Sequence, residues 1–390
     1  MPIVYPYIQY GGIWTTSQAA DAVASGTWAT PPMPHLLSWG QNNSGQSGLG
    51  NRTNYSSPKQ VGSLTNWNVV STTGANGSSF GIKTDGTLWS WGSNANGVLG
   101  LGNITYYSSP KQVGSLTNWA SLASGGGSTY MLAIKTDGTL WSWGWNNQGQ
   151  LGLGNNTNYS SPKQVGSLTT WKKVYAGYTY FTFAIKTDGT LWSWGVNNLG
   201  QLGLGNITSY SSPMQVGLLT NWADISPTIN GAIGLKTDGT LWAWGRNQYG
   251  QLGLGNINNY SSPKQVGSLT NWSNISGNGF YYVCSAIKTD GTLWTWGYGP
   301  FGQLGLGNST YYSSPKQVGS LTNWKTLSTS SFTSTLAIKT DGTLWGWGTN
   351  SYGCLGLGNA TAYNSPKQIG NLTTWLSIAG GYNPLAIAKT

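Results

Sequence analysis

Glutamate is absent from this 390-residue chain, and histidine occurs once, as His35. The eight acidic residues are therefore all aspartates, and only Asp21 and Asp224 lie outside a turn that recurs along the chain. General acid–base catalysis needs a positioned histidine or a pair of carboxyl groups with displaced pKa values. With so few titratable side chains, we expect a protein that is not an enzyme.

Cysteine is also scarce, and no long apolar segment is present. Cys284 and Cys354 are not equivalent in the repeat described below, and they have neither metal-ligand spacing nor a disulfide pattern. No apolar run approaches membrane length, and residues 1–12 lack the basic stretch and leucine-rich core of a secretion signal. We therefore expect no metal, no cofactor, no membrane insertion and no secretion signal.

What the chain does contain is a repeat. A Trp-Gly pair closes an alternating apolar segment seven times, at intervals of 50 to 52 residues. A period of this length, built from short strands and turns, is typical of a ring of small sheets and not of a helical solenoid. The repeat predicts an all-β fold, a seven-bladed β-propeller of four-stranded antiparallel blades. We place it at residues 36–390, after a short leader at residues 1–35.

A single repeat indicates how each blade is built. In the repeat that begins at Trp119, we expect an innermost strand at residues 120–124 and further strands at 131–135 and 140–143. Asp137-Gly138 between the last two is a strong hairpin signal, because the turn requires positive φ. Pro162 is expected to open the outermost strand, where a residue without an N–H is tolerated. The regularly spaced tryptophans are expected to pack between blades.

The two ends of the chain carry incomplete repeats. Residues 36–40 form a third strand without its partners, whereas residues 376–380 and 385–389 form a first and a second strand without a third. We therefore expect the two termini to share one blade, which closes the ring and removes exposed strand edges. In the expected register, Lys389 takes the place that Lys135 has in a complete blade.

The net charge of +10 results from the shortage of acids. Most lysines recur at two repeat positions, in the Lys-Thr-Asp-Gly turns and in the Ser-Pro-Lys-Gln segments. This spacing favours solvated charge around the rim of a ring. The alternative is long-range attraction to nucleic acid, acidic polysaccharide or lipid phosphate. We do not expect a nucleic-acid partner.

The repeated string Trp-Gly-x-Asn-x-x-Gly-Gln-Leu-Gly-Leu-Gly, followed by proline, a strand of small residues and a strand leading to Asp-Gly, resembles the regulator of chromosome condensation repeat. Kelch repeats share the period but lack Gly-Gln-Leu-Gly-Leu-Gly after Trp-Gly. The resemblance implies a seven-bladed propeller. The family's exchange factors for a small GTPase use acidic and loop residues, including an inserted wedge, which have no counterpart in this chain.

The leader has a second resemblance. The string GGIWTTSQAADAVASGTW at residues 11–28 is similar to short N-terminal segments of tail-fibre and other virion proteins of tailed phages. We expect a strand followed by one short helix, in which Thr15 and Gln18 form a capping box. The alternative is an ordinary N-terminal strap across one blade.

The order of the strands assigns the loops to two faces. The connections from first to second strand and from third to fourth strand share one face, which we name the variable face because its loops differ between blades. The Lys-Thr-Asp-Gly turns and the links between blades form the other, nearly invariant face, named the constant face. Aromatic residues among adaptable polar ones are typical of binding surfaces. The candidate binding residues on the variable face are Tyr130, Trp145, Tyr178, Tyr180, Phe181, Arg246, Tyr249, Phe280, Tyr281, Tyr298, Phe301, Phe332, Tyr352 and Tyr382. The alternative is drift in loops that only pack locally.

Two functional hypotheses follow. The first is a virion structural protein of tail-fibre or decoration type, made in the host cytoplasm. The composition, which is poor in charge and rich in Gly, Asn, Ser, Thr, Trp and Tyr, resembles that of a surface-exposed protein, yet the chain has no secretion signal. Its leader would contact other virion proteins, and its variable face would bind a host-surface polysaccharide or a neighbouring virion protein. The alternative is an intracellular regulatory or scaffold protein that binds a protein or chromatin partner, as eukaryotic relatives in the resembled family do.

Overall fold

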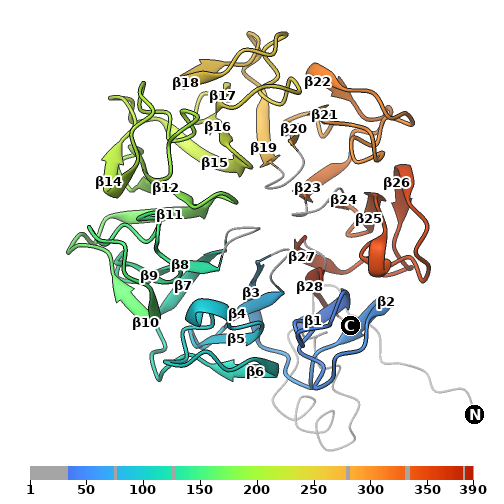
Figure 1. The fold of residues 1–390 in the computed structure, drawn as a ribbon. Coiled ribbons are helices and arrows are strands. Elements are labelled where there is room, and N and C mark those ends of the chain that lie inside the picture. Colours follow the sequence, from blue (N-terminus) through green and yellow to red (C-terminus); the bar gives the residue numbers. More distant parts are fainter. Residues whose placement is uncertain are drawn as a thin grey trace, which may run out of the picture.

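The computed structural model describes residues 34–73, 77–124, 129–277, 282–329, 334–380 and 383–389. Within these residues, seven four-stranded antiparallel sheets stand in a ring around a central axis (Figure 1). The predicted seven-bladed propeller is confirmed. The strand and helix predicted for the leader lie outside the described residues, apart from Pro34 and His35, which begin the first strand.

Six blades are built from consecutive strands, and within each of them the chain runs from the innermost strand to the outermost. Their strands are β3 (Trp67–Thr72), β4 (Ser78–Lys83), β5 (Leu88–Gly92) and β6 (Tyr107–Gln112) in blade 1; β7 (Trp119–Ser124), β8 (Tyr130–Lys135), β9 (Leu140–Gly144) and β10 (Tyr159–Gln164) in blade 2; β11 (Trp171–Ala176), β12 (Phe181–Lys186), β13 (Leu191–Gly195) and β14 (Tyr210–Gln215) in blade 3. Next are β15 (Trp222–Thr228), β16 (Gly231–Lys236), β17 (Leu241–Gly245) and β18 (Tyr260–Gln265) in blade 4; β19 (Trp272–Gly277), β20 (Val283–Lys288), β21 (Leu293–Gly297) and β22 (Tyr312–Gln317) in blade 5; β23 (Trp324–Thr329), β24 (Ser334–Lys339), β25 (Leu344–Gly348) and β26 (Tyr363–Gln368) in blade 6. Two single-turn 3-10 helices, η2 (Ala95–Gly97) and η3 (Ser351–Gly353), lie in variable-face connections.

The outermost strand begins earlier than the sequence predicts. In blade 2 it starts at Tyr159, which pairs with Gly144, so Pro162 lies inside the strand. The pairing is irregular between Tyr159 and Lys163, and Pro162 falls within this stretch. A bulge at a sheet edge leaves positions where no ladder donor is needed, which is why proline fits there.

The closing blade takes strands from both ends of the chain: β1 (Pro34–Gly40), β2 (Tyr55–Gln60), β27 (Trp375–Ala379) and β28 (Leu385–Lys389). Its strand order is β2-β1-β28-β27, so the predicted closure is confirmed. The predicted register is wrong by one residue. Ala388 faces Trp375 in the way that Lys135 faces Trp119 in blade 2, so Lys389 lies one step beyond the lysine position. The cause is Ala388 itself, an additional residue between the last buried isoleucine and the Lys-Thr pair.

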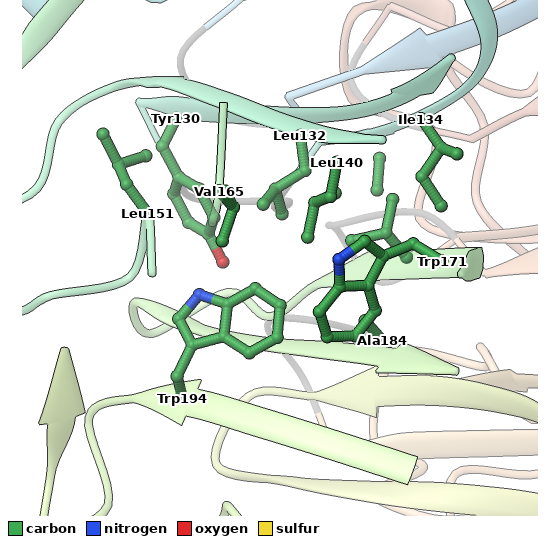
Figure 2. Packing of buried hydrophobic residues seen from close by; sticks show 11 residues of the cluster. Tyr130, Leu132, Ile134, Leu140, Leu151, Val165, Trp171, Ala184 and Trp194 are labelled. Carbon is green, nitrogen blue, oxygen red and sulfur yellow. The ribbon is translucent and has the colours of Figure 1, made fainter. Parts of the chain in front are cut away.

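Each blade is joined to the preceding one by the tryptophan of its Trp-Gly pair. Trp194 of β13 is fully buried, and its indole N–H donates to the carbonyl oxygen of Gln150 in blade 2 at 2.9 Å. Figure 2 shows its ring packed toward Tyr130 and Leu132 of β8, across the boundary between the two blades. All seven blades repeat this bond, with distances of 2.8 to 3.0 Å, from Trp39, Trp91, Trp143, Trp194, Trp244, Trp296 and Trp347. The prediction that these rings form the core between blades is therefore confirmed.

The lysines of the Lys-Thr-Asp-Gly turns are not solvated rim charges, and that interpretation is wrong for them. Lys236 exposes 5% of its surface, and its Nζ lies 3.7 Å from the ring centroid of Trp242 and 5.2 Å from that of Trp222. Lysine buries its methylene stem while its ammonium group contacts aromatic faces. The same stack occurs in blades 1 to 6. The lysines of the Ser-Pro-Lys-Gln segments are exposed as expected.

The aspartates of the same turns are bound by their own hairpins. Asp137 accepts hydrogen bonds from the backbone N–H and the hydroxyl of Thr139, at 2.9 and 2.6 Å. The Thr139 hydroxyl in turn accepts a bond from the indole N–H of Trp141 at 2.9 Å. Gly138 has a φ of +77°, and a Cβ there would lie 2.1 Å from the carbonyl oxygen of Thr169, so only glycine fits. The turns are structural elements, which agrees with their near-identity in successive blades.

These turns predict a loss of stability in acid. In six hairpins the threonine hydroxyl bond lowers the pKa of the aspartate carboxyl (Asp85, Asp137, Asp188, Asp238, Asp290 and Asp341). A carboxyl group whose folded pKa is depressed stabilises the fold above its unfolded pKa, about 3.9, and this contribution is lost as the pH falls through the folded pKa. The melting temperature should therefore be nearly constant from about pH 7 to pH 5 and should fall steeply below about pH 4. Asp137→Asn should make the acid slope shallower. A melting temperature that stays level down to pH 2, about two units below the unfolded pKa, would contradict this.

Candidate binding face

The strand order places the predicted connections on one side of the ring, because all seven blades are antiparallel and six of them have their strands in sequential order. The β19–β20 loop and the β17–β18 and β21–β22 connections therefore leave their sheets on the same side of the ring. Four of the predicted site residues lie outside the described residues: Phe280, Tyr281, Phe332 and Tyr382.

Two of the predicted site residues are buried, and their assignment to a binding surface is wrong. Tyr130 and Phe181 are each 0% exposed. They are the first residues of β8 and β12, and the hydroxyl of Tyr130 donates to the carbonyl oxygen of Phe181 at 2.6 Å. The Phe181 ring packs against Phe183 with centroids 5.7 Å apart. At the start of the second strand a side chain is directed between blades, so both residues belong to the core.

A first aromatic pair on the variable face joins blades 2 and 3. The rings of Trp145 and Tyr180 meet edge to face with centroids 4.4 Å apart, and both side chains are half-buried, as is Tyr178. Tyr180 adopts a φ of +64°, and burial raises the pKa of its hydroxyl. The hydroxyl of Thr179, the residue between Tyr178 and Tyr180, donates to the carbonyl oxygen of Ile229 in blade 4. These contacts fix the loop to its neighbours and leave little aromatic surface for a partner.

A larger group joins blades 4 and 5, and we name it the tyrosine cluster: Tyr249, Tyr282, Tyr298, Phe301 and Tyr311. Tyr249 lies at its centre, with ring centroids 4.9 Å from Tyr282, 4.9 Å from Tyr298 and 5.8 Å from Tyr311. Tyr298 contacts Phe301 at 6.0 Å and Tyr311 at 5.1 Å. Phe301 and Tyr311 expose 44% and 48% of their surfaces. The cluster is a continuous set of aromatic rings, of which Phe301 and Tyr311 are the most exposed.

Arg246 borders the tyrosine cluster. Its guanidinium group donates to the hydroxyl of Tyr282 at 3.1 Å and lies 5.6 Å from the centroid of the same ring. A second N–H donates to the side-chain oxygen of Gln248. Burial raises the pKa of the Tyr282 hydroxyl, and the nearby Arg246 charge opposes that rise. Tyr282 has a φ of +50°, an uncommon conformation for tyrosine, and the arginine contacts fix its ring beside Tyr249.

The remaining predicted residue, Tyr352, is 48% exposed in blade 6.

Two members of the tyrosine cluster are missing from the predicted set, Tyr282 and Tyr311. Tyr282 ends an aromatic run in its loop and could have been included on that basis. Tyr311 directly precedes a constant segment, Tyr-Ser-Ser-Pro, at the end of its connection. The sequence signal that could have pointed to Tyr311 is the tyrosine pair Tyr311-Tyr312. The same pair precedes Ser-Ser-Pro at Tyr106-Tyr107.

The described part of the variable face presents aromatic rings, tyrosine hydroxyl groups and the Arg246 guanidinium group. In the parts of the chain that the structure describes, no three His, Cys, Asp or Glu side chains gather closely enough to hold a metal ion. Both cysteines are buried, which raises the pKa of the Cys354 thiol to about 11 and raises that of Cys284 further. The described residues contain no helix of the length and apolar character needed to span a membrane.

Comparison with known proteins identifies the family. The model of the regulator of chromosome condensation (RCC1) repeat matches seven segments: residues 35–82, 85–132, 137–185, 188–226, 238–283, 290–335 and 341–385. This chain belongs to the RCC1 repeat family. The matched segments fall in all seven blades and end at the first residue of β28, so the resemblance inferred from the repeated strings is confirmed.

Curated relatives include the ultraviolet-B receptor UVR8 of Arabidopsis thaliana, 32% identical over 86% of this chain and 65% of that protein. The mouse E3 ubiquitin-protein ligase HERC2 is 27% identical over 86% of this chain but only 7% of its own length. The chain thus spans less than two thirds of either relative. Among solved structures, human WBSCR16 has a TM-score of 0.80 at 20% identity, covering 92% of this chain and 99% of that one. Yeast Prp20p, described with its binding to Gsp1p and histones, has a TM-score of 0.78 at 18% identity, covering 92% of each chain. The two structures support the fold alone.

Proposed function

We propose that this chain is a non-catalytic propeller that binds a protein partner through the variable face, with the tyrosine cluster at the centre of the contact. The observation that carries the proposal is the cluster itself, in which five aromatic rings from two blades form one partly exposed surface. Partly exposed aromatic rings held by their neighbours lose little conformational freedom on binding, which is why tyrosine dominates binding hot spots.

The relatives favour a protein partner over the virion hypothesis. UVR8 is named as a receptor and Prp20p as a binder of Gsp1p and histones. Neither they nor HERC2 is named as a virion protein. The virion hypothesis depends on the leader, which lies outside the described residues except for its last two, and on composition. Binding of virion proteins or of host polysaccharide therefore remains a prediction without further support. The alternative hypothesis, a regulatory or scaffold protein, is the one that we adopt.

Two tyrosines at the same repeat position provide the test. Tyr311 and Tyr106 both precede a Tyr-Ser-Ser-Pro segment and are similarly exposed, at 48% and 45%, but only Tyr311 lies in the tyrosine cluster. Tyr311→Ala should weaken partner binding by about 2 kcal/mol, as expected for a hot-spot aromatic residue. Tyr106→Ala should change it by less than about 0.5 kcal/mol. Both variants should retain the melting temperature of the wild type.

The measurement is affinity purification of the tagged chain from its native cells, with quantitative mass spectrometry of wild type and both variants. We expect a set of proteins that is retained by Tyr106→Ala and depleted by Tyr311→Ala. If the two variants capture the same proteins in the same amounts as the wild type, the tyrosine cluster does not bind a partner and the proposed function is wrong.

A further inference from the structure

The guanidinium group of Arg246 is charged and has only neutral partners. Its hydrogen bonds go to the Tyr282 hydroxyl and the Gln248 side chain. Among the described residues, the single ion pair is Lys173 with Asp224, at 3.4 Å in the inner strands of blades 3 and 4. A guanidinium group has five N–H donors in a planar fork. Two of them are engaged here, so the others remain available for a ligand.

Among the residues that the structure describes, no acidic residue lies on the variable face to neutralise this charge. None of the first-to-second and third-to-fourth connections contains Asp or Glu, because six aspartates are in the turns of the constant face and Asp224 is in β15. The whole chain carries a net charge of +10. A face without acids on a cationic ring attracts anionic ligands from a distance. The unneutralised arginine is the position at which such a ligand would be held.

We propose that the tyrosine cluster and Arg246 bind an acidic peptide segment of the partner, in which an Asp or Glu carboxylate is received by Arg246. This inference rests on the proposed function and names the chemistry of its partner. A carboxylate matches the guanidinium fork in two parallel hydrogen bonds. The Tyr282 hydroxyl accepts a bond from Arg246, so its own proton can be donated to the same carboxylate.

The arrangement of the rings favours a peptide over a sugar. Tyr298 meets Tyr249 at 71° and Tyr311 at 74°, so its ring stands edge to face against the nearly parallel rings of Tyr249 and Tyr311, and the three do not form one flat platform. We expect aliphatic or proline side chains next to the acidic residue to pack against these tilted rings. Phe301 has no hydroxyl group and adds an apolar wall at the exposed edge of the tyrosine cluster.

The experiment uses the purified full chain and a fluorescent peptide array in which Asp or Glu alternates with proline, leucine and glycine. Each peptide has a twin in which Asn or Gln replaces the acid. For the best peptides we expect the acidic member to bind at least about tenfold more tightly than its twin, as for a close charge pair. Arg246→Gln should remove the difference, and Arg246→Lys should retain only part of it, because an ammonium group lacks the fork. Arg52→Gln is the matched control, since Arg52 is exposed on the variable face of the closing blade.

Several results would overturn the proposal. Equal binding of acidic peptides and their twins would exclude carboxylate recognition. Equal losses from Arg52→Gln and Arg246→Gln, with a steep salt dependence, would indicate diffuse attraction by the cationic ring. Arg246-dependent binding of a uronic-acid polysaccharide, with no peptide bound, would identify a glycan site.

The same variants separate this inference from the proposed function. If Tyr311→Ala depletes cellular partners and Arg246→Gln does not, protein binding stands and acidic-peptide recognition fails. If neither variant changes the captured proteins, both proposals fail. Because Arg246→Gln replaces a half-buried side chain, its melting temperature is compared with that of the wild type before binding is measured.

Discussion

Deletion of residues 385–390 is expected to destroy the folded ring. This segment contains β28, which lies between β1 and β27, so its loss leaves two strands with unpaired edges and separates the ends of the chain. Leu385, Ala386 and Ile387 are at most 2% exposed. Each buried leucine or isoleucine contributes roughly 1.5–3 kcal/mol. The truncated chain should therefore aggregate or unfold, since unpaired edges and exposed apolar surface promote both.

Size-exclusion chromatography and thermal melting test this result. Lys389→Ser, at an exposed position of the same strand, should melt like the wild type. A synthetic peptide with the sequence of residues 383–390 should restore solubility to the truncated chain when added during refolding. A soluble monomeric truncation with an unchanged melting temperature would show that the termini do not share a blade.

The second large effect is expected from Trp194→Ala. Trp194 is 0% exposed, and its indole N–H bonds to the Gln150 carbonyl of the preceding blade, so the substitution creates a cavity and removes a bond between blades. Removal of a large buried aromatic side chain costs about 3–5 kcal/mol. Trp192→Ala should lower the free energy of unfolding by about 1–2 kcal/mol. Trp192 is only half-buried, and in the variant water can hydrate the Lys186 ammonium group that stacks on its ring.

Urea unfolding of the two variants measures the difference in free energy directly. The denaturation midpoint of Trp194→Ala should fall well below that of Trp192→Ala. Trp194→Phe should lie between the wild type and Trp194→Ala, because it retains most of the ring but leaves a buried carbonyl with fewer donors, which costs about 1–3 kcal/mol. Equal midpoints for Trp194→Ala and Trp192→Ala would mean that the blades are not coupled through the buried ring.

The propeller and its closure could be predicted because they depend on periodicity, which is explicit in the sequence. The register of the closing blade could not. Matching Lys389 to Lys135 follows the Lys-Thr pattern, but the strand pairing follows the buried residues. Ile387 stays opposite Leu36, as Ile134 stays opposite Leu140, and the additional alanine moves the lysine outward. Burial of apolar side chains determines the register more strongly than the identity of an end residue.

The candidate site was predicted at the level of the face and only in part at the level of its residues. Arg246, Tyr249, Tyr298 and Phe301 were in the predicted set, whereas Tyr282 and Tyr311 were not. Strand order alone assigns a loop to one side of the ring, whereas it does not tell whether an aromatic side chain points outward. Tyr130 and Phe181 stand where a loop becomes a strand and point inward. Tyr311 and Tyr106 are indistinguishable in their local sequence, and only the neighbouring blade makes one of them part of a cluster. The lysine stacks were missed for a similar reason, because the tryptophan partners of each lysine lie on adjacent strands.

Pro34 and Lys389 face each other in the pairing of β1 with β28. The two ends of the described chain therefore emerge at the same end of one antiparallel strand pair, on the constant face. Tension applied to them acts along the direction of the interstrand hydrogen bonds and breaks these bonds one after another, as in unzipping. A strand pair pulled in shear would instead share the load over all its bonds. The closing blade, which secures the ring against heat, is thus the place where a weak mechanical force can open it.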